Sequence, residues 1–393
     1  MNKTTTARSL ASLMAVFMIA GACSSTPGGA TTAPSVATPS GGAPSGAAPS
    51  DAAPSDAVPS DGEPSMGGGE GMYRIGVSNP GSVGNGWREE MLCSAQAQGV
   101  ASGEVSEIRI LNRETDPAGQ LADIRTLIAD DVDAIIVNPS DPEALNPAIK
   151  EATDAGIVVI AIDAAVTEAS AYNLSNDQET YAYLGATWLF EQMGGEGDVV
   201  YMRGFAGHPA DTARDVGFKR AAAENEGINI VSETFTDWTQ PKAIEQITTL
   251  INAGTNIDGV WTSGIDNVVV EAFEQNDAPY VPVVGADNVG FVAQLLDPEG
   301  FEGLTGAAVT NPGSVGGAGV TLALQILNGE EPDSNTVLLE PQLWDNVSEE
   351  GLASLEAAND PSLNPIWPLG LTIEGWTTYT KEQLLACKGP GEA

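Results

Sequence analysis

Short apolar runs alternate with longer segments of helical period from residue 73 to residue 327. The apolar runs are rich in Val and Ile, and the clearest of them are continuous, as strands buried on both faces require. We expect strands at 73–77, 108–111, 132–137, 157–162, 198–202, 228–231, 257–261, 281–284 and 304–309. We expect helices at 87–98, 118–129, 142–155, 178–193, 211–224, 241–253, 267–275, 291–296 and 317–327.

The alternation restarts partway along this region. After the strand at 157–162, the next helix begins at 178, and a second series of strands and helices follows. Strands that alternate with helices of roughly a dozen residues are typical of parallel sheets with right-handed crossovers. The sequence therefore predicts an α/β protein with two similar lobes. Ligands of such sheets bind beyond the carboxyl ends of the strands.

Residues 1–23 have the features of a bacterial lipoprotein signal peptide. Lys3 and Arg8 precede a short apolar run, and small residues then lead directly to Cys23, as in a lipobox. We therefore expect Cys23 to be lipidated and to begin the mature protein. The alternative is ordinary secretory cleavage after Ala22.

Residues 24–71 have a different composition from the remainder of the chain. A five-residue unit ending in Pro-Ser repeats seven times between Thr31 and Ser65, and the segment has no aromatic and no basic residue. Such a segment cannot bury enough apolar surface to offset its ordering entropy. It predicts a disordered, extended tether. No later apolar run approaches the roughly 20 residues needed to span a membrane, so the lipid anchor is the only membrane contact expected.

The charge narrows the possible partners. The chain has 54 acidic and 15 basic residues and a formal net charge of −39. This excludes nucleic acid, which requires clusters of Lys and Arg, and disfavours an anionic membrane surface. One His and three Cys argue against a metal cluster, and no phosphate-binding P-loop is present. We expect neither a metal nor a cofactor.

Polar and aromatic side chains follow several different strands. The sequence NPGSVG occurs twice, each time between a strand and a helix, and carries Asn79 and Asn311. Carboxylate, amide and guanidinium groups together suit a neutral polyhydroxylated ligand, and indole rings cover the apolar faces of a sugar. For each residue alone, a helix cap or a core position is the alternative. The expected ligand-binding residues are Asn79, Trp87, Asp163, Arg214, Trp238, Asn267, Asp287, Thr310 and Asn311.

The order and spacing of these segments resemble the type I periplasmic-binding-protein family, in particular the ribose- and galactose-type sugar-binding components of ABC transporters. The resemblance covers residues 73 to about 343 and rests on IGVSNPGSVGNGWREEM, VNPSDP, VVIAIDA, RDVGF and VVGADN. It implies two Rossmann-like lobes with parallel sheets, joined by a three-segment hinge. The implied divisions are 72–176 plus 311–343 for the N-terminal lobe, 177–310 for the C-terminal lobe, and 344–393 for an extension crossing back to the first lobe.

The resemblance also implies roles for several residues. Asp163 matches a carboxylate that binds ring hydroxyls, and Arg214 matches a sugar-binding arginine. Trp238 matches an aromatic residue that stacks on the sugar, and Asp287 matches the carboxylate of the second lobe. Trp87 lies near the aromatic residues of the family's first turn.

Other positions are less closely matched. Thr310 or Asn311 corresponds to a polar hinge position, and Asn267, Asp266 or Ser263 corresponds to a polar site after the strand at 257–261. Many ribose-type proteins carry Arg directly after the first carboxylate, whereas Ala164 stands here. A donor is therefore missing, and the ligand need not be ribose.

The implied function is that of a membrane-tethered, extracytoplasmic binding component of an ABC importer. It would capture a monosaccharide or related polyol by hinge closure and deliver it to the permease. We expect an exported monomer, lipid-anchored to the outer face of the bacterial cytoplasmic membrane or periplasmic. The alternatives are a sensory protein that presents a sugar or autoinducer-like ligand to a receptor, and a binder of a nucleoside or polyol.

An enzyme is not expected. The sole histidine, His208, precedes a proline and has no Ser or Cys nucleophile motif nearby. A pair formed by Asp163 and Asp287 could support glycosidase chemistry, but no feature of the sequence requires it.

Two cysteines remain after lipidation of Cys23. In an exported, oxidising compartment, a disulfide between Cys93 and Cys387 is expected. It would attach the C-terminal extension to the first lobe. The alternative is two buried thiols.

Overall fold

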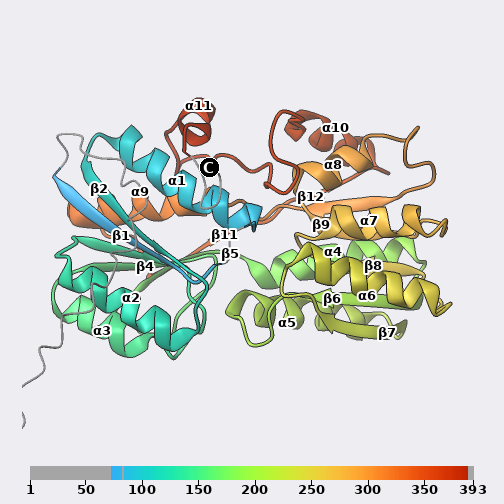
Figure 1. Ribbon diagram of the computed structural model, residues 1–393, viewed down its shortest axis with the longest axis horizontal. Helices are drawn as coiled ribbons and strands as arrows, with labels where there is room; N and C mark the ends of the chain where they lie inside the picture. The colour runs from blue at the N-terminus through green and yellow to red at the C-terminus, as the bar shows by residue number, and fades with distance from the viewer. Residues whose placement is uncertain (1–71, 82–83, 388–393) are drawn as a thin grey trace, which may run out of the picture. The chain divides into compact units, whose positions relative to one another are not determined.

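The computed structural model describes residues 72–81 and 84–387. The predicted signal peptide, the lipidation site Cys23 and the tether at 24–71 lie outside these residues. The described residues form two six-stranded sheets, each covered by helices on both faces (Figure 1). The predicted α/β architecture with two lobes is confirmed.

The sheet of the first lobe is parallel throughout, with strand order β11-β5-β4-β3-β1-β2. Its central strands are almost completely buried on both faces, which is why they appear in the sequence as continuous apolar runs. The strands are β1 (Tyr73–Asn79), β2 (Val105–Asn112), β3 (Ala134–Val137), β4 (Val158–Ile162), β5 (Tyr172–Asn176) and β11 (Thr336–Leu339). The helices are α1 (Gly86–Ser102) and α9 (Val315–Leu327) on one face, and α2 (Pro117–Ala129) and α3 (Asn146–Asp154) on the other.

The second lobe repeats this plan with strand order β12-β10-β9-β8-β6-β7. Its edge strand β12 runs antiparallel to β10, whereas the other strands are parallel. The strands are β6 (Glu196–Arg203), β7 (Gly227–Phe235), β8 (Gly259–Trp261), β9 (Val283–Ala286), β10 (Gly306–Val309) and β12 (Leu343–Asp345). The helices are α4 (Gln178–Gln192) and α5 (Pro209–Glu224) on one face, and α6 (Gln240–Asn252), α7 (Asp266–Gln275), α8 (Val289–Leu295) and α10 (Glu349–Ala358) on the other.

The chain crosses between the lobes four times within the described residues. The first three crossings lie at 177, 310–314 and 340–342, between elements of different sheets. The sequence-based boundary at 343 is displaced, because Leu343 pairs with Val309 in the second sheet. The extension then packs on the second lobe as far as Leu371 and returns to the first lobe, where Ile373 joins the core and α11 (Lys381–Leu385) lies against α1.

Several elements were not expected from the sequence. Strand β5 was missed because its buried face carries polar residues, and Asn173 accepts a hydrogen bond of 2.8 Å from the backbone N–H of Val166. The helix expected from Pro142 begins later, because the carboxylate of Asp141 accepts hydrogen bonds from the next backbone N–H groups and holds a turn. Strands β11 and β12 and helices α10 and α11 were also missed.

Candidate functional site

A cavity of about 470 Å³ lies between the two lobes, beyond the carboxyl ends of the strands. Six of the nine expected ligand-binding residues line it, and their contact with a ligand stays a prediction. They are Trp87, Asp163, Arg214, Trp238, Asp287 and Asn311. The lining also includes residues that the sequence analysis did not select, among them Arg88, Phe205, His208, Gln240, Asn288, Ile366 and Pro368.

Asp163 is placed by an unusual backbone conformation. It follows β4 in the left-handed region, with a φ of 66°, a conformation that costs free energy for a residue other than glycine and that clusters at functional sites. Gln178 donates a hydrogen bond of 2.7 Å to Oδ1 of its buried carboxylate. Burial raises the pKa of Asp163, while Arg214 and Arg88 act in the opposite direction. Both guanidinium groups therefore favour the charged form of this carboxyl group.

Arg88 brings a second guanidinium group to the cavity lining, although Ala164 stands where many ribose-type proteins carry an arginine. It lies in the first turn of α1, whose start is fixed because the side chain of Asn85 accepts a hydrogen bond from the backbone N–H of Arg88. Its Nη1 donates to Asn79 Oδ1 at 2.7 Å. Burial lowers the pKa of Arg88 to about 10, so it stays charged at neutral pH. The sequence did contain a signal for Arg88: it is a basic residue within one helical turn of the loop that was expected to bind ligand.

Arg214 enters the cavity from α5 in the second lobe. Its Nε donates to Gln178 Oε1 at 2.7 Å, and its Cζ lies 4.3 Å from the centre of the Tyr181 ring. These contacts fix the plane of the guanidinium group. Among the described residues, the remaining nitrogens of Arg214 approach only the amide of Asn311, at 3.2 Å from Nη2. Arg214 thus retains donors for a ligand.

Trp238 is held in place from several sides. Its φ is 50° and that of Asp237 is 53°, so two consecutive residues are left-handed, which is rare for a bulky side chain. The indole lies against the backbone of Gly204, where a Cβ atom would collide with it. Its Nε1 donates to Ser263 Oγ at 3.2 Å. A rigid aromatic surface in the second lobe results.

Trp87 provides a second indole, from α1 of the first lobe. Its Nε1 donates to the carbonyl oxygen of Asn311 at 2.8 Å, in the second crossing between the lobes. The side-chain amide of Asn311 lies 2.8 Å from Asn176 Nδ2 and 3.2 Å from Gln178 Nε2, at the first crossing. The aromatic and amide groups of the site are thereby attached to the hinge.

His208 was noted in the sequence but not selected for the site. It is the N-cap of α5, where its Nδ1 accepts a hydrogen bond from the backbone N–H of Ala210 at 3.2 Å. Burial lowers the pKa of His208 to about 3, and Arg88 and Arg214 act in the same direction. The neutral ring therefore carries its proton on Nε2. That nitrogen is buried and has no hydrogen-bond partner in the described part of the chain.

Asp287 follows β9 and is completely buried. Its Oδ1 accepts a hydrogen bond of 3.0 Å from the backbone N–H of Asn311, and its Oδ2 accepts one of 3.2 Å from Gly370. Burial raises the pKa of Asp287 to about 6, although these hydrogen bonds act against the shift. This carboxylate therefore contacts the hinge and the C-terminal extension as well as the cavity.

Three expected ligand-binding residues do not line the cavity. Asn79 lies behind Arg88 and bonds Asn112 through its Nδ2 at 2.7 Å. Thr310 contacts the third crossing between the lobes, where its Oγ1 accepts a hydrogen bond of 2.8 Å from the backbone N–H of Gln342.

Asn267 is the third of these residues. Its Oδ1 accepts a hydrogen bond of 3.4 Å from Gln240 Nε2. The preceding Asp266 is completely buried and accepts hydrogen bonds from Thr262 and the backbone of Ala286, which fixes the adjacent loops. Of the three positions that the resemblance left open here, Ser263 is the one that lines the cavity.

The described residues contain no group of three or more His, Cys, Asp or Glu side chains arranged to hold a metal ion. Within the same residues, no helix has the length and apolar character needed to cross a bilayer.

Comparisons with known proteins agree with this architecture. A family model described as a periplasmic binding protein domain matches residues 75–331. The xylitol-binding protein of Mycolicibacterium smegmatis is 26% identical over 237 residues, which cover 59% of this chain and 67% of that protein. The ribose import binding protein RbsB of Escherichia coli is 24% identical over 226 residues, covering 56% of this chain and 75% of that protein.

Solved structures show the same fold. An ABC transporter solute binding protein from Thermobispora bispora has a TM-score of 0.68 and 24% identity, covering 80% of this chain and 94% of that one. A solute binding protein from Bacillus halodurans with bound myo-inositol has a TM-score of 0.63 and 24% identity, covering 73% and 98%. With two lobes, a cavity between them and a matching family model over most of its length, this chain belongs to the periplasmic binding protein domain family.

Proposed function

We propose that this protein captures a sugar or polyol in the cavity between its lobes and delivers it to the permease of an ABC importer. The observation that carries the proposal is the set of groups around the cavity. Buried carboxylates, buried guanidinium groups with unused donors and one indole from each lobe line the same space. The volume of about 470 Å³ lies within the range of roughly 300–1,000 Å³ typical of small-molecule sites.

The proposed ligand contacts follow from these groups. Asp163 accepts hydrogen bonds from ligand hydroxyls, and Arg88 and Arg214 donate to hydroxyl or ring oxygens. His208 is a further donor through Nε2–H. Trp238 covers an apolar face of the ligand. The relatives named for xylitol and ribose, and the structure that holds myo-inositol, support a polyhydroxylated ligand.

The proposed mechanism is closure of the lobes around the ligand. Asp163 and Arg88 belong to the first lobe, and Arg214 and Trp238 belong to the second, so a ligand that contacts all of them favours the closed state. A ligand shifts such an equilibrium by its difference in affinity for the two states. The closed form is the one that docks on the permease.

The proposed location is the outer side of the cytoplasmic membrane, with Cys23 as the lipid anchor. The disulfide that joins Cys93 and Cys387 supports an oxidising compartment. Metabolic labelling with a fatty acid tests the anchor, since Cys23→Ser should abolish the label.

Calorimetric titration with pentoses, hexoses and polyols tests the ligand class. At least one of them should bind, and Arg214→Met should weaken it at least tenfold. Arg220→Met is the matched control, because Arg220 lies on the same helix, 43% exposed and paired with Glu179 outside the cavity. Absence of binding across the panel, or equal loss in both variants, would refute the proposal.

A further inference from the structure

The C-terminal extension contributes to the cavity through residues 363–371, which we call the closing segment. Ile366 and Pro368 of this segment line the cavity together with residues of both lobes. Leu363 and Leu369 are buried in the core of the second lobe, and Trp367 is buried among residues of α1 and α11. The closing segment therefore belongs to the folded body of the protein on both sides of the cleft.

Backbone hydrogen bonds attach the closing segment to the second lobe. The backbone N–H groups of Val289 and Gly290 donate to the carbonyl oxygens of Trp367 and Pro365 at 2.9 and 2.8 Å. These are the first two N–H groups of α8, which have no acceptor within the helix. The closing segment thus supplies acceptors that the start of α8 requires.

Further contacts join the closing segment to Asp287. The backbone N–H of Leu369 donates to the carbonyl oxygen of Asp287 at 2.9 Å, and that of Gly370 donates to its Oδ2 at 3.2 Å. The carbonyl of Gly370 also accepts a hydrogen bond of 2.6 Å from Ser314 Oγ, in the second crossing. The orientation of a cavity-lining carboxylate therefore depends on the closing segment.

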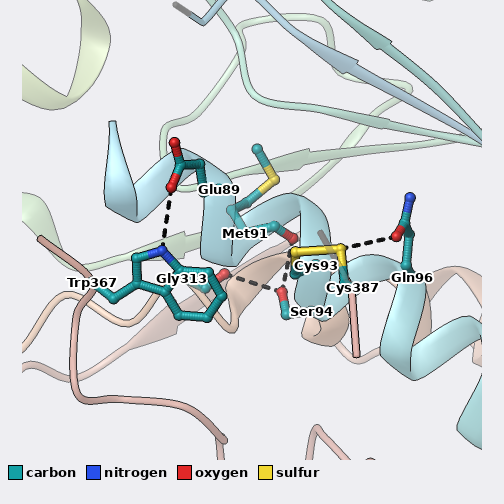
Figure 2. Close-up of a disulfide and its surroundings, with 8 residues drawn as sticks. All are labelled: Glu89, Met91, Cys93, Ser94, Gln96, Gly313, Trp367 and Cys387. Carbon is teal, nitrogen blue, oxygen red and sulfur yellow. Dashed lines mark hydrogen bonds between the residues drawn. A yellow bond between two sulfur atoms is a disulfide. The ribbon is translucent and has the colours of Figure 1, made fainter. Parts of the chain in front are cut away.

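Contacts with the first lobe lie on α1 (Figure 2). The Nε1 of Trp367 donates to Glu89 Oε2 at 3.3 Å. The carbonyl of Ile366 lies against Gly86, where a Cβ atom would collide with it. The disulfide between Cys93 and Cys387 fixes the chain to the same helix, one to two turns further along. A glycine at position 86 is required by this close approach.

We propose that the closing segment is a fixed wall of the ligand cleft and that Ile366 and Pro368 determine which ligands fit. This inference rests on the proposed function, since it concerns the ligand of the same cavity. The two side chains are apolar, and proline has no N–H to donate. A ligand hydroxyl directed at them would lose its hydrogen bonds with water without replacement. The wall therefore selects a ligand that turns a hydroxyl-poor edge toward it and limits the size of the ligand on that side.

Selectivity among three probes tests the inference. Ile366→Ala and Pro368→Ala should change the ratio of the affinities for myo-inositol, D-ribose and xylitol by at least fivefold. For Ile366→Ala, which enlarges the cavity, the change should favour myo-inositol, the cyclic six-carbon probe. Leu352→Ala is the matched control, because Leu352 lies on α10 of the same extension, 37% exposed and away from the cavity. Ratios in both wall variants that equal the control ratio would overturn the inference.

Amide hydrogen exchange tests the wall without any ligand. The N–H groups of Val289 and Gly290 should be protected in the unmodified protein and should exchange at least tenfold faster in Trp367→Ala. The N–H of Phe291, whose acceptor is Asn288 Oδ1, serves as the internal control. If no sugar or polyol of the full panel binds the unmodified protein, the proposed function and the ligand selection by Ile366 and Pro368 both fail, and protected amides would then show only that the segment is fixed to α8. If the N–H groups of Val289 and Gly290 exchange without protection in the unmodified protein, the closing segment is not held on α8 and the inference is wrong.

Discussion

Replacement of Arg88 by methionine tests how the site compensates for Ala164. Arg88 is 6% exposed and lines the cavity, and among the described residues its side chain donates a single hydrogen bond, to Asn79. Its Nε and Nη2 are therefore available to a ligand. Hydrogen bonds to charged groups each contribute about 1.5–3 kcal/mol, and a ligand oxygen left unpaired adds to the cost. Loss of one such hydrogen bond, about 2–3 kcal/mol with the unpaired oxygen included, corresponds to a Kd raised roughly 30- to 150-fold.

The same substitution changes the pH dependence of binding. Arg88 and Arg214 both lower the pKa of Asp163 against the effect of burial. Loss of Arg88 therefore raises the pKa of this carboxyl further, so that it becomes protonated, and loses its strength as an acceptor, at a higher pH than before. Binding by Arg88→Met should weaken with falling pH earlier than binding by the unmodified protein. Arg88→Lys, which keeps the charge, should fall between the two.

Calorimetric titration between pH 5 and pH 8 measures both effects, with the ligand identified from the sugar and polyol panel. Thermal unfolding of each variant, followed by circular dichroism, separates a loss of binding from a loss of folding. An unchanged Kd in a folded Arg88→Met variant would refute the assignment of Arg88 to the ligand. An unchanged pH profile would refute its electrostatic coupling to Asp163.

Three further predictions concern the cavity-lining Trp238, the disulfide between Cys93 and Cys387, and His208. Trp238→Ala should weaken ligand binding by about 1–2 kcal/mol through loss of apolar contact. In calorimetric titration, Trp238→Phe should retain most of the affinity of the unmodified protein. Equal affinities in the unmodified protein and both variants would argue against stacking. Cys93→Ser should lower the free energy of unfolding in urea by about 2–5 kcal/mol, and a smaller change would show that the extension is held by packing alone. The pKa of His208 is lowered to about 3 in the folded protein. Below about pH 6.5 the unfolded state therefore binds a proton on this histidine that the folded state does not bind. The free energy of unfolding consequently falls as the pH decreases from about 6.5. His208→Asn should flatten that decline in urea titrations at pH 4–7, and an equally steep decline would exclude His208 as its source.

The elements that the sequence predicted well are those that fold by burial alone. Strands such as β3 (Ala134–Val137) consist of apolar residues buried on both faces, so local composition specifies them. Strand β5 (Tyr172–Asn176) contains buried Asn and Ser residues, and the amide of Asn176 bonds the amide of Asn311, 135 residues away along the chain. A local pattern cannot reveal such partners.

The residues that line the cavity also divide into those that local sequence predicts and those that depend on tertiary contacts. Asp163, Arg214, Trp238 and Asp287 were selected because each follows a strand, and the parallel sheets bring these positions to one edge. Arg88 and His208 were not selected, because their roles depend on which side of a helix start faces the cavity. Asn267 was selected by its position in the chain but lies outside the cavity lining, since the first turn of α7 directs it toward Gln240.

The sequence by itself determined the two-lobed α/β architecture and the polar and aromatic chemistry at the strand ends, because periodicity and strand-end position are local properties of a chain. Only the tertiary structure decided which side chains share the cavity and where the C-terminal extension goes. Ile366 and Pro368 are about 200 residues from Asp163 along the chain. They reach the cavity because Trp367 packs on α1, the start of α8 needs acceptors and the disulfide fixes the end of the chain. Contacts between such distant segments are set by packing, which no local pattern encodes.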